Sequence, residues 1–133
     1  MKTNLLFFGF VVISLFALNS CGLGEAKTEA QAAAKIFHKH MRNRDHESMV
    51  NMIHSEGLTL TPKEEWLKLF KGLDVLGKIK NIKQDMSFHT SIENGVTTVE
   101  LNYTIDYIKR TMNEQLILKK EGKTFKLIGY SIN

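Results

Sequence analysis

The apolar residues of this chain change their spacing once, near Gly77. Before that point they recur every three or four residues, a spacing that is typical of amphipathic helices. In the first such segment they are Ala30, Ala33, Phe37 and Met41. After Gly77, apolar and polar residues alternate, which is typical of strands with one buried face. The pattern therefore predicts helices first and strands afterwards.

Local start and stop signals divide the helical part into three. Asp45 is suited to cap a second, short helix, which we expect Gly57 to end. Thr61, Pro62 and Glu64 occupy the N-cap, first and third positions of a capping box. We therefore expect a third helix to begin with Thr61 as its N-cap.

The alternating part predicts four strands joined by short turns. The clearest is residues 97–107, in which Thr97, Val99, Leu101 and further alternate residues share one face. The letters "ENG" before it are typical of a hairpin turn. Short connections indicate an antiparallel meander. We therefore predict an α+β fold, with N-terminal helices packed on a curved antiparallel sheet of about four strands.

An uncharged apolar run occupies residues 5–18, after a short head that contains Lys2. It is shorter than the roughly 20 residues that a membrane-spanning helix needs, and it is typical of a secretory signal peptide. The letters "LNSC", which end at Cys21, resemble the lipobox of bacterial lipoproteins, with Asn19 in place of the usual small apolar residue. The resemblance implies a lipoprotein signal peptide over residues 1–20, an acylated Cys21 that attaches the chain to a lipid bilayer, and a tether over residues 21–29. The alternative is an ordinary signal or anchor with an incidental cysteine.

A lipid anchor would place the protein in the cell envelope, because two or more acyl chains hold a protein stably on a membrane. Gly22, rather than Asp, follows the cysteine. This favours the outer membrane in an organism that has one. Cys21 is the only cysteine, so an intramolecular disulfide is excluded.

The charge of the chain argues against a nucleic-acid partner. The formal net charge is +4, and loss of Lys2 with the leader reduces it to +3. Both signs are scattered, as on a solvated surface, and lysines near strand ends are a common protection against edge pairing. We expect no nucleic-acid binding.

Four segments resemble the NTF2-like (cystatin-like) superfamily: "FHKHMRNRDHESMVNMI", "LGKIKNIK", "VELNYTIDY" and "KTFKLIGYSIN". The last resembles the "W-k-i-x-G-Y-x-I" ending of small NTF2-like domains of unknown function, with Phe125 in the Trp place. The resemblance implies that residues 30–133 form a cone-shaped domain. The superfamily includes isomerases, dehydratases, cyclases and ligand-free scaffolds, so it does not define an activity.

The resemblance also implies a site at the mouth of the cone. The side chains expected to line a cavity there are Phe37, Met41, Trp66, Phe70, Tyr103, Tyr107 and Tyr130. The alternative is that they simply fill the core. His40 is the best candidate for a polar site group, unless it is a surface residue, and alternation places Asp106 opposite the tyrosine face.

We assign no catalytic residue, metal or cofactor. The five histidines form no H-x-x-x-H pair, and we expect all of them at the surface. The preferred function is a membrane-tethered envelope lipoprotein whose domain is not catalytic and binds a small apolar ligand or a protein partner. The polar sheet face is compatible with a weak homodimer. The alternative is a small-molecule enzyme of the isomerase, dehydratase or cyclase type.

Overall fold

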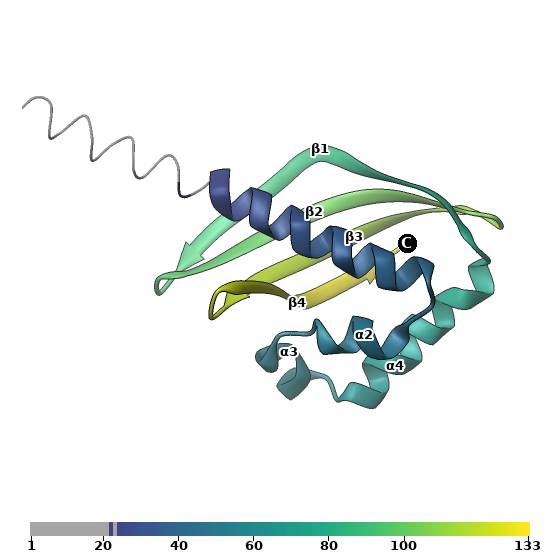
Figure 1. The fold of residues 1–133 in the computed structure, drawn as a ribbon, viewed down its shortest axis with the longest axis horizontal. Coiled ribbons are helices and arrows are strands. Elements are labelled where there is room, and N and C mark those ends of the chain that lie inside the picture. Colours follow the sequence, from purple (N-terminus) through teal and green to yellow (C-terminus); the bar gives the residue numbers. More distant parts are fainter. Residues whose placement is uncertain (1–21, 23) are drawn as a thin grey trace, which may run out of the picture.

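The computed structural model describes residue 22 and residues 24–133 (Figure 1). A long helix over residues 24–42 comes first. The elements after it are α2 (His46–Asn51), α3 (Ser55–Leu60), α4 (Lys63–Gly72), the 3-10 helix η1 (Leu73–Leu76), β1 (Ile79–Glu93), β2 (Val96–Tyr107), β3 (Thr111–Glu121) and β4 (Thr124–Ile132). The helices precede the strands, as predicted.

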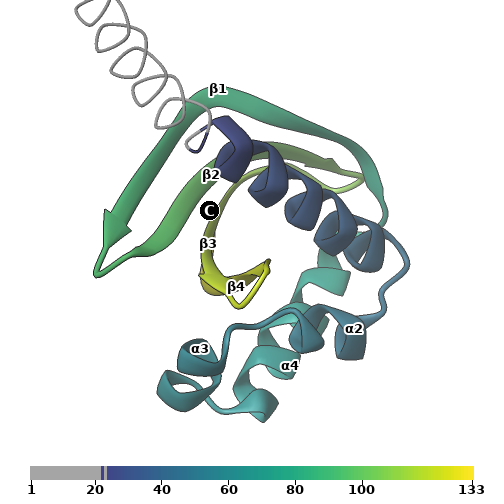
Figure 2. The same cartoon turned by 60° about the vertical axis from the view of Figure 1, so that its left-hand side comes forward.

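The four strands form one antiparallel sheet in the order β1-β2-β3-β4. The sheet is strongly curved and arches around the first helix, while α2, α3 and α4 lie beyond the edge strand β4 (Figure 2). A parallel bridge between Ile53 and Leu127 ties the chain before α3 to that edge. The predicted α+β class, with helices on a curved antiparallel sheet, is confirmed.

Strand β2 confirms the predicted alternation. Its residues from Val99 to Tyr107 are alternately buried and half-buried, and its pairing with β3 is regular throughout. The turn before it contains Asn94 and Gly95, both with positive φ, at 51° and 77°. This backbone matches the right-handed twist of the strands on either side.

The first helix buries one stripe against the concave face of the sheet. The stripe consists of Ala30, Ala34, Phe37, His38 and Met41, each at most 7% exposed. Their separations of three and four residues place them on one side of a helix. The stripe therefore includes a histidine among its apolar residues.

Residues 24–29, which we assigned to a tether, are helical and continuous with this first helix. Glu29 belongs to the fold, since its carboxylate lies 2.6 Å from Lys120 Nζ. The expected signal peptide and Cys21 lie outside the described residues. Within residue 22 and residues 24–133, no helix has both the length and the apolar character needed to cross a membrane.

Asp45 caps α2 as predicted, because its carboxylate accepts a hydrogen bond from the Ser48 amide at 3.2 Å. Gly57 does not end that helix: α2 stops at Asn51, and Gly57 lies inside α3. The glycine serves close packing there, since a Cβ atom would lie 3.0 Å from Ile53 Cγ2.

The predicted capping box at Thr61 does not form. The N-cap of α4 is Pro62, which offers no side-chain hydrogen bond. Thr61 instead ends α3, and its amide donates to the Gly57 carbonyl at 3.0 Å. The Thr61 amide, which Glu64 would have bonded in a capping box, already has a partner in the preceding helix.

Candidate functional site

The side chains that we expected around a cavity all come together inside the fold. Phe37, Met41, Trp66, Phe70, Tyr103 and Tyr107 are at most 7% exposed, and Tyr130 packs against them partly buried. The structure therefore unites the seven residues.

These side chains fill the interior rather than enclose a cavity. The ring of Phe70 lies 5.6 Å from those of Phe37 and Tyr130 and 5.8 Å from that of Trp66, between centroids. The hollow beside Met41 and Phe70 measures about 20 Å³, which is room for about one water molecule. The described core leaves no space here for a drug-sized ligand.

A buried polar pair lies at one side of this core. His38 Nε2 is 2.6 Å from Glu114 Oε2, and the two side chains are 8% and 0% exposed. The His38 ring also meets the Tyr103 ring edge-on, with centroids 4.5 Å apart. Glu114 thus fixes the orientation of the imidazole from β3, and Tyr103 fixes it from β2.

Tyr130 reaches the same place through an irregularity in β4. Leu116 pairs with Tyr130, but Leu118 pairs with Leu127, so β4 contains one extra residue, Ile128, between these pairs. This bulge turns Tyr130 toward the core. The Tyr130 hydroxyl and Glu114 Oε1 are both buried, and neither has a hydrogen-bond partner among the described residues. They are close enough for the carboxylate to influence the hydroxyl, but their geometry falls short of a hydrogen bond.

The tyrosine hydroxyls around this pair keep their protons. Burial raises the pKa of Tyr103, Tyr107 and Tyr130, and the negative charge of Glu114 raises each pKa further. Tyr107 donates to Met41 Sδ at 3.7 Å. The tyrosines can therefore act as hydrogen-bond donors but not as bases.

Neither member of the buried pair was predicted from the sequence. We expected His38 at the surface, and Glu114 was not considered. The signal was available in both cases. His38 follows Ala34 by four residues in the apolar stripe, and Glu114 precedes Leu116 by two on the buried face of its strand. Each polar residue occupies an apolar position in the pattern.

His40, the polar group that we favoured, does not face the sheet. Its side chain is 27% exposed, and its Nδ1 lies 3.8 Å from Asp45 Oδ2 at the surface. Asp106 points away from the tyrosines, as alternation predicted, and accepts a hydrogen bond from the Thr111 hydroxyl at 2.7 Å. Neither residue lies in a position to act inside the fold.

An open groove of about 810 Å³ runs between the first helix and β1. His38 and Tyr103 lie at its floor, beside Ile82 and Gln84. The remaining lining residues come from the helix and from the residue that follows it, and are Gln31, Lys35, Ile36, Lys39, Arg42 and Asn43. Within the described part of the chain, none of the lining residues is acidic, and Lys35, Lys39 and Arg42 make no salt bridge. The groove is thus apolar in part and positively charged along one wall.

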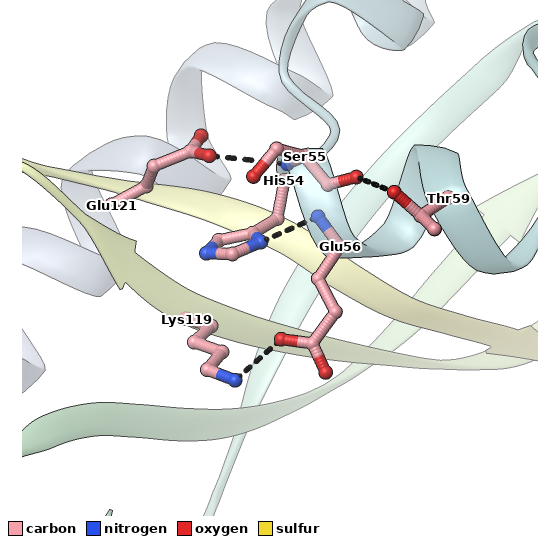
Figure 3. Close-up of polar contacts among 6 residues, drawn as sticks. All are labelled: His54, Ser55, Glu56, Thr59, Lys119 and Glu121. Atoms are coloured by element: carbon pink, nitrogen blue, oxygen red, sulfur yellow. Dashed lines mark hydrogen bonds and ion pairs between the residues drawn. The ribbon is translucent and has the colours of Figure 1, made fainter. Parts of the chain in front are cut away.

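A second polar cluster lies at the start of α3 (Figure 3). The His54 Nδ1 atom accepts from the Glu56 amide at 3.0 Å, the Ser55 amide donates to Glu121 at 3.2 Å, and Lys119 bonds Glu56 at 2.6 Å. Although the cluster contains serine, histidine and carboxylate groups, the imidazole caps a helix and has no lone pair at Nδ1 to spare. His54, which we expected at the surface, is only 8% exposed. The cluster ties α3 to the sheet.

Among residue 22 and residues 24–133, no three His, Cys, Asp or Glu side chains converge as metal ligands. No protein-family model matches the chain, and a search of curated proteins finds no similar sequence.

Proposed function

We propose that this chain is a lipid-anchored protein of the cell envelope, whose domain is a non-catalytic binding module of the NTF2-like type. The lipobox-like "LNSC" supports the anchor. The order of helices and strands and the "KTFKLIGYSIN" ending support the superfamily. The binding site in this proposal is the groove between the first helix and β1.

The observation that carries the proposal is the contrast between a filled core and a charged open groove. The hollow of about 20 Å³ that Met41, Phe70 and Tyr107 help to line is too small for the small apolar ligand that we expected, whereas the groove of about 810 Å³ is within the size range of ligand sites. Binding therefore takes place on the rim of the cone rather than inside it.

The lining defines the chemistry of the ligand. Lys35, Lys39 and Arg42 recur at separations of four and three residues, so they form one cationic row along the helix. Ile36, Ile82 and the Tyr103 ring provide apolar surface beside it. A molecule with an anionic group and a short apolar chain complements both parts.

The experiment is an NMR titration of protein that lacks residues 1–21, after circular dichroism has shown that it is folded. Octanoate is the probe and octanol its uncharged counterpart. We expect octanoate to shift the amide signals of the groove residues and octanol to bind at least about tenfold more weakly, which corresponds to about 1.4 kcal/mol.

Two charge variants locate the site. Lys35, Lys39 and Arg42 changed together to Gln should weaken octanoate binding. Lys68, Lys71 and Lys109, all exposed outside the groove, provide a control with the same loss of charge. Equal binding of octanoate and octanol, or equal loss in both variants, would show that the groove does not select anions.

The anchor has its own test, which uses the full chain in a bacterial host. Cys21→Ser should abolish labelling by radioactive palmitate and leave unprocessed precursor, because the thiol is the site of acylation. Normal labelling and membrane attachment of this variant would exclude the lipoprotein assignment.

Catalysis is the second candidate, and the buried pair favours it. An imidazole oriented by a carboxylate is a common acid–base arrangement. A base must, however, come within about 2.6–3.2 Å of the proton that it removes, and the side chains of His38 and Glu114 are 8% and 0% exposed. Recovery of a chemically altered ligand, lost on His38→Gln, would favour the enzyme.

A further inference from the structure

The start of the first helix lies very close to the proposed lipid anchor. The continuous described helix begins at Gly24, three positions after Cys21. Even a fully extended chain of three residues spans at most about 11 Å. If Cys21 carries acyl chains, the first turn of the helix must therefore lie at the membrane surface.

Both hairpins on this side of the fold contact the beginning of the helix. Lys27 Nζ lies 3.8 Å from the centroid of the Phe88 ring on β1, and Glu29 pairs with Lys120 on β3. In both views the β1–β2 turn lies toward the same side of the fold as the N-terminal end of the helix (Figures 1 and 2). The anchor thus brings a defined end of the domain to the bilayer.

This end exposes large apolar side chains. Met86 is 97% exposed, Ile92 60% and Phe88 44%, all within a stretch of seven residues. The register of β1 shifts between Gln84 and Phe88, and Met86 lies inside this irregular segment. Phe88 and Ile92 lie opposite Leu101 and Thr97 of β2, on the concave face of the sheet. The first helix leaves both side chains partly exposed.

We propose that the outer half of β1, with Met86, Phe88 and Ile92, docks into the bilayer that holds Cys21. The proposal rests on the lipid anchor of the proposed function. A bilayer fits better than a second protein copy because the short connection from Cys21 to Gly24 forces membrane contact whatever else binds. The cation of Lys27 above the Phe88 ring suits a phosphate-rich interface.

Docking would also orient the groove. Gln31, at the groove, donates to Gln84 at 3.1 Å. It follows Gly24 by seven residues, or about 10 Å of helix. The near end of the groove would then lie just above the headgroups, and the cationic row would begin one turn further along the helix, at Lys35, so that an anionic amphiphile could pass from the membrane into the groove without crossing bulk water.

The experiment uses the full, acylated chain in vesicles of phosphatidylethanolamine and phosphatidylglycerol, with and without bromine on the acyl chains. Met86→Trp places a reporter on the docking face. Val75→Trp places the control in η1, near the opposite end of β1; Val75 is 66% exposed. The native Trp66 is buried in both variants and provides a constant background.

We expect brominated lipid to quench about half of the added fluorescence of Met86→Trp and little of that of Val75→Trp, since interfacial side chains reach roughly 5–10 Å into the boundary. Flotation with the vesicles reports the anchor separately. Flotation without quenching of Trp at position 86 would overturn the docking face and leave the anchor intact. Failure to float would overturn both. A third outcome is that brominated lipid does not quench the tryptophan at position 86, and that this tryptophan becomes more shielded from water as the number of protein molecules per vesicle rises. This result would identify a second copy of the chain as the occupant and would also overturn the proposal.

Discussion

The buried pair of His38 and Glu114 makes a strong prediction about stability. Glu114 is 2% exposed, one of its carboxylate oxygens already has no partner among the described residues, and the other depends on His38 Nε2 at 2.6 Å. His38→Leu removes that donor and leaves a carboxylate buried with neither oxygen satisfied. We expect the free energy of unfolding to fall by about 3–5 kcal/mol, the usual cost of breaking a buried charged pair on one side.

Replacing both partners should be far less harmful. In His38→Leu/Glu114→Leu no charge is buried, and the two leucines fill much of the same space. We expect this variant to lie within about 1 kcal/mol of the parent. The lost edge-on contact with Tyr103, about 0.5–1.5 kcal/mol, occurs in the single and the double variant alike and cancels in a double-mutant cycle.

Urea unfolding monitored by tryptophan fluorescence measures these differences. With a urea dependence of about 1.5 kcal/mol per molar, His38→Leu should lower the midpoint by about 2–3 M. Glu114→Gln keeps an acceptor for His38 and should remain folded even if His38→Leu does not. A cost below about 1 kcal/mol for His38→Leu, or a double variant as unstable as the single one, would show that the pair is not the buried unit that the structure describes.

Two further changes test the core and the α3 cluster. Phe70→Ala removes the ring at the centre of the aromatic contacts and should cost about 3–5 kcal/mol in urea unfolding, whereas Leu69→Ala, at a position 39% exposed, should cost far less. Contacts with Ser55 lower the pKa of Glu121 to about 2 from an ordinary 4.5, so its contribution to stability is complete above about pH 4.5 and is lost as the pH falls toward 2. The free energy of unfolding of Glu121→Gln should therefore fall less than that of the parent between pH 5 and pH 2. Glu93→Gln, on the exposed hairpin, is the control. If the pH dependence of stability were the same in Glu121→Gln and the parent, the role of the cluster would be contradicted.

The pattern of the sequence was sufficient for the fold because most of the core obeys simple periodicity. The alternate residues of β2 and the stripe of the first helix are buried as their spacing predicts. The failures occur where two elements meet. Glu64 could not complete a capping box because the Thr61 amide already donates to Gly57 in α3. Helix α3 in turn is tied to β3 through Ser55–Glu121 and Glu56–Lys119, pairs that are 66 and 63 residues apart in the sequence.

The site was harder to predict because polar residues were interpreted by their type rather than by their position. His38 and Glu114 each lie on an apolar face, and neither had a partner in the nearby sequence, since 76 residues separate them. The register shift in β1 near Met86 could not be predicted for a similar reason. Apolar and polar residues alternate regularly around Met86 in the sequence, but the shift depends on how β2, a different segment, pairs with β1.

The first helix links the packed core of this fold to the proposed binding groove and to the proposed lipid anchor. Its buried stripe passes through Ala34, its cationic row passes through Lys35, and one residue of helix rotates the side chain by about 100°. The row therefore lies beside the stripe. Ile82 and Gln84 of β1 line the same groove as the row, so the row is on the side where the helix meets β1. Because Phe37 and His38 belong to the same helix and are buried, any rotation of the helix that opened the groove would also move these two side chains out of the core. The groove is consequently a preformed surface, whose shape is fixed by the packing beneath it.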